Sequence, residues 1–477
     1  MNKHNVLKLD SDSVKELRKD LYEPDPSKKE EALVDTRFSC PISKYSAGTH
    51  MKMKLEQTQA GEGKINYIAS KKFDALFQLK AHTKLPYIKV KDKFSESVSI
   101  CYVHNLMHNI LYAGELKIDD DHIESLDSVY VDNKCQYFVT KTDLYDKSIG
   151  NIECLEEWSR ELPSLPLSFP QPFSFFRKTN VSLPLLKSNN NVVFEYKVRT
   201  KLSELLRMRV AKKDEKTGQI HYKEIKCNLK YLDIKGKEEN IPIPEMWGRY
   251  AELTDAEVNW KKSEEGRQTI YIEDVYSTCS KNPIPMGSTD IIPLDCPYPS
   301  KYMYWTASLV NNDNQPACLS NYSTNREDVY KGWNPCAKAC IKYGGSDRVE
   351  EMGYEHFEFS EAYDFDFPSA PREPGYNLYV FSFEPRRINP SDNLVILKNC
   401  KAELNVTLGD TNPFLIKNDE DEYYDDNNQA IPIEALEDDE HAKSQREKYI
   451  VHVRVVFTRR LEVFWDNKAN KLKYVFT

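Results

Sequence analysis

Several features that mark other protein classes are missing from this sequence of 477 residues. It contains no run of about 18 apolar residues, so the sequence predicts no membrane-spanning helix. Its opening stretch, MNKHNVLKLDSD, lacks the apolar segment of a signal peptide. Glycine is scarce, and neither a Gly-rich phosphate loop nor a G-x-S-x-G motif is present. We therefore expect a soluble, non-secreted chain without a nucleotide site or a hydrolase nucleophile.

An excess of positive charge is also missing. The chain has 66 Lys and Arg residues against 75 Asp and Glu residues, a formal net charge of −9. Proteins that bind nucleic acid usually carry a basic patch or a basic arm. Residues 1–31 instead mix both signs, as in KELRKDLYEPDPSKKEE. We expect no direct sequence-specific contact with nucleic acid.

The cysteines do not form a recognisable metal or disulfide framework. Their number is eleven, and they are scattered along the chain, which is typical of reduced thiols. Cys336 and Cys340 have the spacing of one helix face and not that of a zinc knuckle. Three glycosylation sequons, interpreted as chance matches, begin at Asn180, Asn321 and Asn405. The sequence predicts no metal and no cofactor.

Two histidines, His104 and His108, raise the question of a zinc site. Their spacing matches half of the HExxH motif, in which both ligate zinc and the Glu after the first is the general base. Here Asn105 takes the place of that Glu, and an amide cannot accept a proton from metal-bound water. The β-formers at 98–103 and the later Gly114 argue against a helix. We expect a structural pair on or beside a strand; a second hypothesis is that it tunes an interface with pH.

Alternating side chains predict several half-buried strands. In VVFEYKVR (192–199), Val192, Phe194 and Tyr196 point to one side and charged residues to the other. The 29 Tyr and 20 Phe residues also favour strands. Further strands are predicted at 269–276, 377–383, 402–408, 449–458 and 472–476.

Helices are predicted to be few. Residues 254–265 begin with a capping box, Thr254 and Glu257, and Gly266 follows as a stop signal. Residues 73–79 fit a short helix or a strand equally well. Long irregular loops are expected at 311–348, which is rich in Asn, Asp, Ser, Gly and Pro, and at 410–447.

The loop at 410–447 is strongly acidic and lacks apolar periodicity. Its stretch DEDEYYDDNN has neither the glycine nor the spacing of a calcium loop, so we expect a solvated loop. Many strands joined by long loops are typical of sandwich or jelly-roll folds. No pair of carboxylates is placed in a plausible cleft, so the sequence predicts no catalytic residue.

A family resemblance begins at the histidine pair. NLMHNI (105–110), then LD at 126–127 and IGN at 149–151, resembles the first half of the major capsid proteins of iridoviruses, which are nucleocytoplasmic large DNA viruses. The Pro- and Phe-rich stretch LPLSFPQPFSFFRKTNVSLPLL (165–186) resembles the segment that precedes a strand in that family. The alternating strand at 192–199 follows at the expected place.

The second half of the chain is similar to the same family. MWGRYAELTDAEVNW (246–260) resembles its W-G-x-Y strand and the short helix after it, and IYIEDVYS and SKYMYWTASLVNN (300–312) resemble its next strands. Within 352–408, a Gly-Tyr pair opens a Tyr/Phe strand, a Pro-Ser turn follows, and two more strands come after. Two departures, Asp392-Asn393 after Pro390-Ser391 and a poorly matching end, indicate a divergent member.

The resemblance implies an all-β chain of two consecutive eight-stranded jelly rolls, with long loops and a few short helices. The implied domains are an arm at 1–31, a first jelly roll at 32–205, a connecting segment at 206–240 and a second jelly roll at 241–477. The implied function is that of a structural, non-enzymatic major capsid protein that resides in the virion.

Three copies would form a pseudo-hexameric capsomer, and capsomers would tile an icosahedral shell assembled in the host cytoplasm. Implied partners are other copies, neighbouring capsomers, minor capsid proteins and internal viral membrane proteins. Large interfaces favour aromatic anchors over charges, which suits the many Tyr and Phe residues. Two alternatives stay open: a double jelly-roll scaffold protein of an immature virion, and a carbohydrate-binding or carbohydrate-active jelly roll.

Overall fold

The computed structural model describes residues 51–476, except residues 60, 62, 177–181, 214–219, 237–238, 311–317, 327, 388–393, 410–422, 425–429 and 432–447. The predicted arm at 1–31, Asn180, the turn at Pro390-Ser391 and nearly all of the acidic loop therefore lie outside the described residues. Within the described part of the chain, every pair of neighbouring strands is antiparallel. None of its helices is long and apolar enough to cross a membrane.

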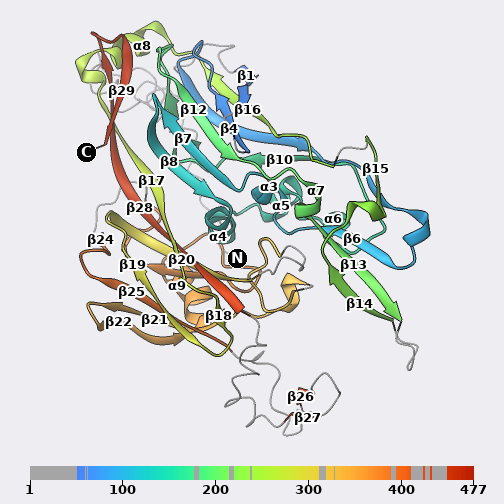
Figure 1. Ribbon diagram of the computed structural model, residues 1–477. Coiled ribbons are helices and arrows are strands. Elements are labelled where there is room, and N and C mark those ends of the chain that lie inside the picture. The colour runs from blue at the N-terminus through green and yellow to red at the C-terminus, as the bar shows by residue number, and fades with distance from the viewer. Residues whose placement is uncertain are drawn as a thin grey trace, which may run out of the picture.

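Two sheets form the first jelly roll (Figure 1). One sheet has the order β1 (Met51–Lys54), β16 (Glu245–Ala251), β4 (Ala75–Lys84), β10 (Pro166–Pro170), with β11 (Leu183–Pro184) also paired to β4. The other sheet has the order β2 (Glu56–Gln59), β3 (Lys64–Ile68), β12 (Val192–Lys197), β7 (Ala113–Ile118), β8 (Asp121–Asp127). Strand β12 alternates as predicted, with Val192, Phe194 and Tyr196 buried.

Two small sheets extend the edge of this jelly roll. Their orders are β14 (Ile220–Ile225), β13 (Leu206–Lys213), β6 (Val98–Tyr102), and β15 (Leu232–Ile234), β5 (Ile88–Val90), β9 (Glu161–Leu162). The predicted connecting segment at 206–240 thus pairs with strands of the first jelly roll, and so does β16. The division at residues 205 and 241 stays a prediction, and we propose that the first jelly roll continues through β16.

The second jelly roll also has two sheets. The larger one contains β17 (Gln268–Cys279), β28 (Lys448–Asp466), β20 (Pro299–Leu309) and β23 (Asn377–Val380), joined by β18 (Ile284–Pro285), β24 (Val395–Ile396) and β29 (Lys471–Phe476). The smaller one has the order β19 (Thr289–Leu294), β25 (Ala402–Leu408), β21 (Cys336–Tyr343), β22 (Ser346–Gly353). A separate pair, β26 (Tyr423–Tyr424) with β27 (Ala430–Ile431), falls within the acidic loop. All the strands predicted from alternation are confirmed, and 73–79 contributes to β4.

Short helices connect the strands. They are α3 (Leu106–Ile110), α4 (Ser128–Phe138), α5 (Thr142–Ile149), α6 (Glu153–Glu156), α7 (Leu202–Leu205), α8 (Asp255–Lys262) and α9 (Glu361–Asp364), with a π-helical turn, η8 (His356–Ser360), before α9. Short 3₁₀ turns are η3 (Asp92–Phe94), η4 (Ser174–Phe176), η5 (Leu229–Tyr231), η6 (Glu264–Gly266) and η7 (Val329–Lys331). The capping box is confirmed, because Thr254 Oγ1 accepts a hydrogen bond from the Glu257 backbone N–H.

Four predictions about local structure were wrong. Residues 356–364, where a Tyr/Phe strand was expected after the Gly353-Tyr354 pair, form η8 and α9. Cys336 and Cys340 lie on strand β21 and not on a helix face, and β21 and β22 occupy the end of the supposed irregular loop at 311–348. His108 lies in helix α3, although the β-formers before it argued against a helix. Those β-formers make β6, and the chain then turns at Asn105, whose φ of 49° is left-handed and suits Asn. The pair does lie beside a strand, as expected.

One apolar core runs through both jelly rolls. Strands β17 and β28 extend from the second jelly roll along the first (Figure 1), and their residues Ile272 and Leu461 belong to the same buried cluster as the first jelly roll. Tyr304 of β20 stacks on Tyr137 of α4, with ring centroids 5.5 Å apart. We call Ile272, Tyr304, Tyr137 and Leu461 the apolar seam. A second cluster fills only the second jelly roll.

Candidate functional site: a polar clasp between the jelly rolls

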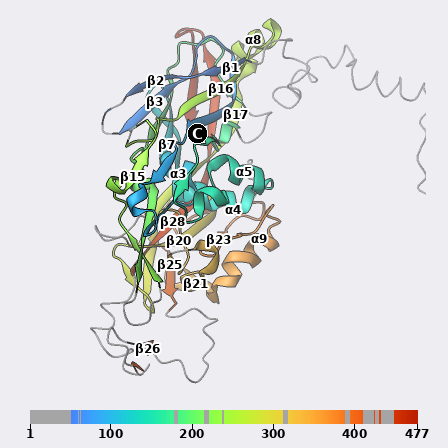
Figure 2. The same ribbon diagram turned by 90° about the vertical axis from the view of Figure 1, so that its right-hand side faces the viewer.

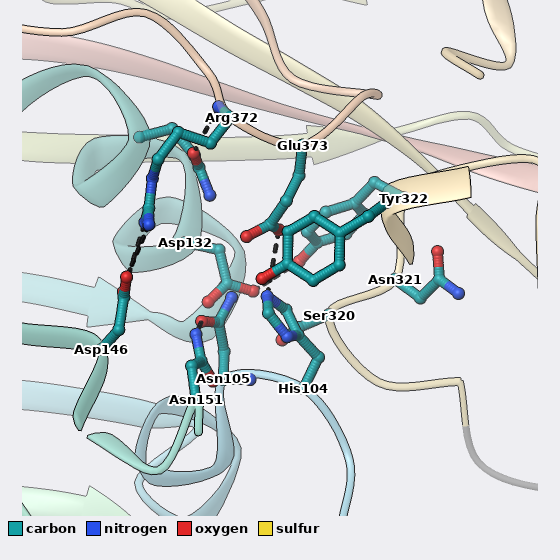
Figure 3. A network of polar contacts seen from close by, with 12 residues as sticks. His104, Asn105, Asp132, Asp146, Asn151, Ser320, Asn321, Tyr322, Arg372 and Glu373 are labelled. Atoms are coloured by element: carbon teal, nitrogen blue, oxygen red, sulfur yellow. Dashed lines mark hydrogen bonds and ion pairs between the residues drawn. The ribbon is translucent and has the colours of Figure 1, made fainter. Parts of the chain in front are cut away.

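A largely buried polar network joins the two jelly rolls (Figure 3). From the first jelly roll it takes His104, His108, Asp132, Asp146 and Glu156, and from the second Tyr322, Arg372 and Glu373. We call these eight residues the polar clasp. The histidines are on or next to α3, Asp132 is on α4, Asp146 is on α5, and the partners in the second jelly roll come from irregular chain between its strands.

His104 is the centre of the first connection. Its Nδ1 lies 2.5 Å from Glu156 Oε1, and its Nε2 lies 3.0 Å from Glu373 Oε2. The side chain of Glu373 is 2% exposed, so this carboxylate needs a charged partner. A protonated imidazole donates both hydrogen bonds. The contact to Glu373 spans 269 residues of sequence and links the jelly rolls directly.

The surroundings of His104 favour its charged form. Burial lowers its pKa, but the charges of Glu373 and Glu156 and their hydrogen bonds outweigh burial and raise the pKa well above the usual value. For Glu373, burial raises the pKa, whereas His104 and Arg372 lower it, and the net result is a lowered pKa. The pKa shifts of His104 and Glu373 are those expected of a buried ion pair.

His108 makes the second connection through Asp132. Its Nδ1–H donates to Asp132 Oδ1 at 2.6 Å, and the Tyr322 hydroxyl donates to Asp132 Oδ2 at 2.9 Å. The other ring nitrogen lies 2.8 Å from the Tyr145 hydroxyl, which also accepts a hydrogen bond from the Cys135 thiol. Burial lowers the pKa of His108, but the hydrogen bonds to Asp132 and Cys135 outweigh it and raise this pKa to about 9.

Two further contacts border the clasp. Arg372 binds Asp146 with both guanidinium nitrogens, at 2.5 and 3.2 Å, near the surface. Asn109 donates to the His104 carbonyl and to the Ser320 hydroxyl, both at 2.8 Å. On the first jelly roll's side, Asn151 holds the Asn105 turn, because its Oδ1 accepts the Asn105 backbone N–H at 2.8 Å.

The arrangement of the clasp residues suits a role in holding the two jelly rolls in one relative position. Both imidazoles lie between groups that accept their hydrogen bonds, and both are almost fully buried. Within the described residues, no three His, Cys, Asp or Glu side chains gather as a metal site would need. The clasp therefore fixes how the two jelly rolls sit against each other, which directional ion pairs do better than apolar contacts.

The described surface also has a hollow of about 360 Å³, lined by β7, β8, β12 and β17. Its charges are matched within the chain. Glu195 binds Lys64 at 2.9 Å, Glu115 binds His122 at 2.7 Å, and Asp127 binds Arg454 at 2.7 Å. The hollow is therefore a part of a sheet face that is lined by ion-paired side chains.

His104 and His108, singled out in the sequence, are both buried and bound to carboxylates. That their role is structural stays a prediction. Asn321 is buried at a relative exposure of 6%, and its side chain donates to the Asn325 carbonyl, so this sequon is not displayed for modification. Asn405 lies within β25. Sequence reasoning missed the carboxylates that hold the histidines, because they lie 24 to 269 residues away from them.

Comparisons with known proteins agree with this fold. A family model described as large eukaryotic DNA virus major capsid protein matches residues 263–436. The major capsid protein of Simulium iridescent virus is 22% identical over 336 residues, covering 66% of this chain and 68% of that protein. That of Lymphocystis disease virus 1 is 23% identical over 367 residues, covering 67% and 71%.

Solved structures show the same architecture. The Faustovirus major capsid protein matches with a TM-score of 0.60 at 8% identity, covering 94% of this chain and 96% of that one. A chain of the PBCV-1 virus capsid matches with a TM-score of 0.59 at 15% identity, covering 90% and 98%. The fold is a double jelly roll, as expected. The chain is similar in sequence and in fold to the major capsid proteins of large eukaryotic DNA viruses.

Proposed function

We propose that three copies of this chain associate into a ring-shaped, pseudo-hexameric capsomer, and that such capsomers tile an icosahedral shell. The observation that carries this proposal is the fixed relation between the two jelly rolls. A ring of three chains resembles a hexamer only if the two jelly rolls of each chain keep one orientation. The apolar seam and the polar clasp together supply that constraint.

The energetics of the clasp support the same reading. Three partly or fully buried pairs cross or border the contact between the jelly rolls: His104 with Glu373, Asp132 with Tyr322, and Asp146 with Arg372. A relative rotation of the jelly rolls would separate His104 from Glu373, and a broken buried ion pair costs about 3–5 kcal/mol. The partly exposed pair of Asp146 with Arg372 would add at most about 1 kcal/mol. The free chain is therefore expected to hold the orientation that a ring requires.

We infer that the remaining contacts follow from this place in a shell. Minor capsid proteins and internal viral membrane proteins are the expected partners on the inner side, and assembly is expected in the host cytoplasm. A formal net charge of −9 supports a shell protein that makes no sequence-specific contact with the packaged nucleic acid.

The test is the mass and outline of the purified chain in solution. Light scattering should give three times the chain mass of 55.6 kDa, and negative-stain microscopy of the same peak should show hexagonal outlines. A stable monomer or an isologous dimer under all conditions would contradict the proposal. Detection of the protein in purified mature particles would then separate a coat protein from a scaffold that is shed.

A further inference from the structure

Two faces of the chain differ sharply in charge and lie far from each other. One is built by η8 and α9 of the second jelly roll, and the other by β5, β14, η5 and β15 at the edge of the first. Figure 2 shows α9 on one side of the molecule and β15 on the opposite side. Neither face belongs to the clasp or to the seam.

The face on η8 and α9 combines acids with exposed aromatic rings. Seven Asp and Glu residues and no Lys or Arg occur between residues 350 and 366. Tyr363 is 85% exposed and Phe359 is 45% exposed, and they lie four residues apart on one side of the helical segment. Glu355 and Asp364 are exposed beside them. We call these four residues the acidic aromatic face.

The helical segment is anchored so that this face points outward. Glu358 and Glu361 of the same segment are buried, and they accept hydrogen bonds from the Asn334 side chain and the Val380 backbone N–H. Cationic side chains bind at the margins of this face, where Lys338 pairs with Glu351 at 3.2 Å and the Arg386 guanidinium donates to the Asp366 backbone carbonyl. A large, exposed aromatic side chain held on a rigid element is typical of an interface anchor.

The opposite face is rich in lysine. Eight lysines against three acids occur in residues 84–93 and 223–235 taken together. The two segments meet directly, because β5 pairs with β15 and Lys91 Nζ donates to the Lys230 carbonyl at 2.9 Å. Exposed lysines there include Lys93, Lys223, Lys230 and Lys235. We call these four residues the basic face.

Aromatic groups accompany the basic face as well. Tyr222 on β14 is 48% exposed, and the guanidinium of Arg209 lies 4.2 Å from the centre of its ring. Glu224 is neutralised by its ion pair with Arg207, which leaves the lysines to set the sign of the face. The two faces are therefore complementary in charge, and each presents an aromatic ring.

We propose that the acidic aromatic face of one copy docks on the basic face of the next copy around the ring. Such a contact is heterologous, because it joins two different patches, and a heterologous contact can close into a threefold ring. It would place the second jelly roll of each chain against the first jelly roll of its neighbour. The inference rests on the proposed capsomer and adds the surfaces that hold it together.

Substitution of the aromatic anchors tests the first face. In the full-length chain, Phe359→Ser combined with Tyr363→Ser should weaken association about 10- to 100-fold in light scattering over a dilution series. Ile291→Ser is the matched control, because Ile291 is 55% exposed on β19, outside both faces. An unchanged far-ultraviolet circular dichroism spectrum shows that each variant is folded.

Charge reversal tests the pairing of the two faces. Glu355→Lys with Asp364→Lys, or Lys223→Glu with Lys230→Glu, should each give monomers, because like charges then oppose each other. The variant with all four substitutions should recover the trimer, because attraction is restored with the signs exchanged. If both reversal variants still form trimers as readily as the wild type, this inference is wrong, whereas the proposed capsomer is not affected. A wild-type chain that stays monomeric would instead contradict the capsomer itself and the inference with it.

Discussion

The apolar seam and the polar clasp join the same two jelly rolls with opposite chemistry. The seam packs Ile272, Tyr304 and Leu461 into a core shared with the first jelly roll, and its free energy depends on buried area and hardly on direction. The clasp buries charges whose value depends on geometry, because each ion must keep its partner. From this contrast we infer that the seam supplies most of the free energy that holds the jelly rolls together, and that the clasp selects one orientation.

The largest expected effect comes from removing a buried charge of the clasp. Glu373→Ala leaves His104 with Glu156 alone, and we expect a loss of about 3–5 kcal/mol in the free energy of unfolding. Chemical denaturation measures it. The control is Glu351→Ala, which removes one partner of a pair that is more than half exposed and should cost at most about 1 kcal/mol. Equal losses in the two variants would contradict the importance of the clasp.

A substitution in the apolar seam should act through the side-chain volume that it removes. Leu461 is fully buried, so Leu461→Ala removes apolar contacts and leaves a cavity, at a cost of about 2–5 kcal/mol. We expect this loss to be the same at pH 6.5 and at pH 9, because no charge is involved. A loss that changes with pH would show that the seam and the clasp are not separate, and urea unfolding at both pH values gives the answer.

The clasp, unlike the seam, should depend on pH. The pKa of His108 is raised to about 9 from an ordinary 6.5, so the folded chain holds this proton more tightly than the unfolded chain. The resulting stabilisation is complete below about pH 6.5 and is lost as the pH rises through about 9. We expect the unfolding free energy to fall over pH 7.5–9, and to fall less in His108→Gln.

Two carboxyl groups restrict the pH range in which the effect of His108 on the unfolding free energy can be measured. Burial raises the pKa values of Glu358 and Glu361 to about 7, so their protonation also stabilises the folded chain below that pH and is lost through about pH 7. Above pH 7.5 these two carboxyl groups no longer contribute, but His104, whose pKa is also raised, still does. The difference in slope between the wild type and His108→Gln therefore isolates His108. An identical slope in wild type and His108→Gln would contradict the assignment. The hypothesis that His104 and His108 tune an interface with pH stays a prediction. The interface concerned is the one between the two jelly rolls.

The smallest effect is expected at the edge of the clasp. The Arg372 side chain is 40% exposed in its pair with Asp146, so water screens the interaction. Arg372→Ala should cost at most about 1 kcal/mol, and less in high salt. Thermal unfolding at low and high ionic strength measures this, and a loss as large as that of Glu373→Ala would remove the distinction between buried and exposed pairs.

The strands were predictable because their alternation reports one buried face directly, as in β12 and β25. Helix α8 was predictable from its cap. Helix α4 was not, because the face it buries includes Asp132, Asn133 and Gln136, so no apolar period of 3.6 marks it. Helix α3 likewise buries His108 and Asn109.

The candidate site was half predictable. The spacing of His104 and His108 drew attention to the right place, and Asn105 in place of a general base excluded the zinc interpretation. Their carboxylate partners carry no local signal, since Glu373 joins His104 only after the second jelly roll has folded against the first. Long-range ion pairs of this kind follow from topology and not from spacing.

We conclude that the two jelly rolls form one building block. Scanning calorimetry of the purified chain at pH 6.5, compared with Glu373→Ala, tests it most directly. We predict a single cooperative transition for the wild type, with the variant shifted to lower temperature or split into two transitions. Two separate transitions already in the wild type would show that the jelly rolls are independent, and would contradict the account.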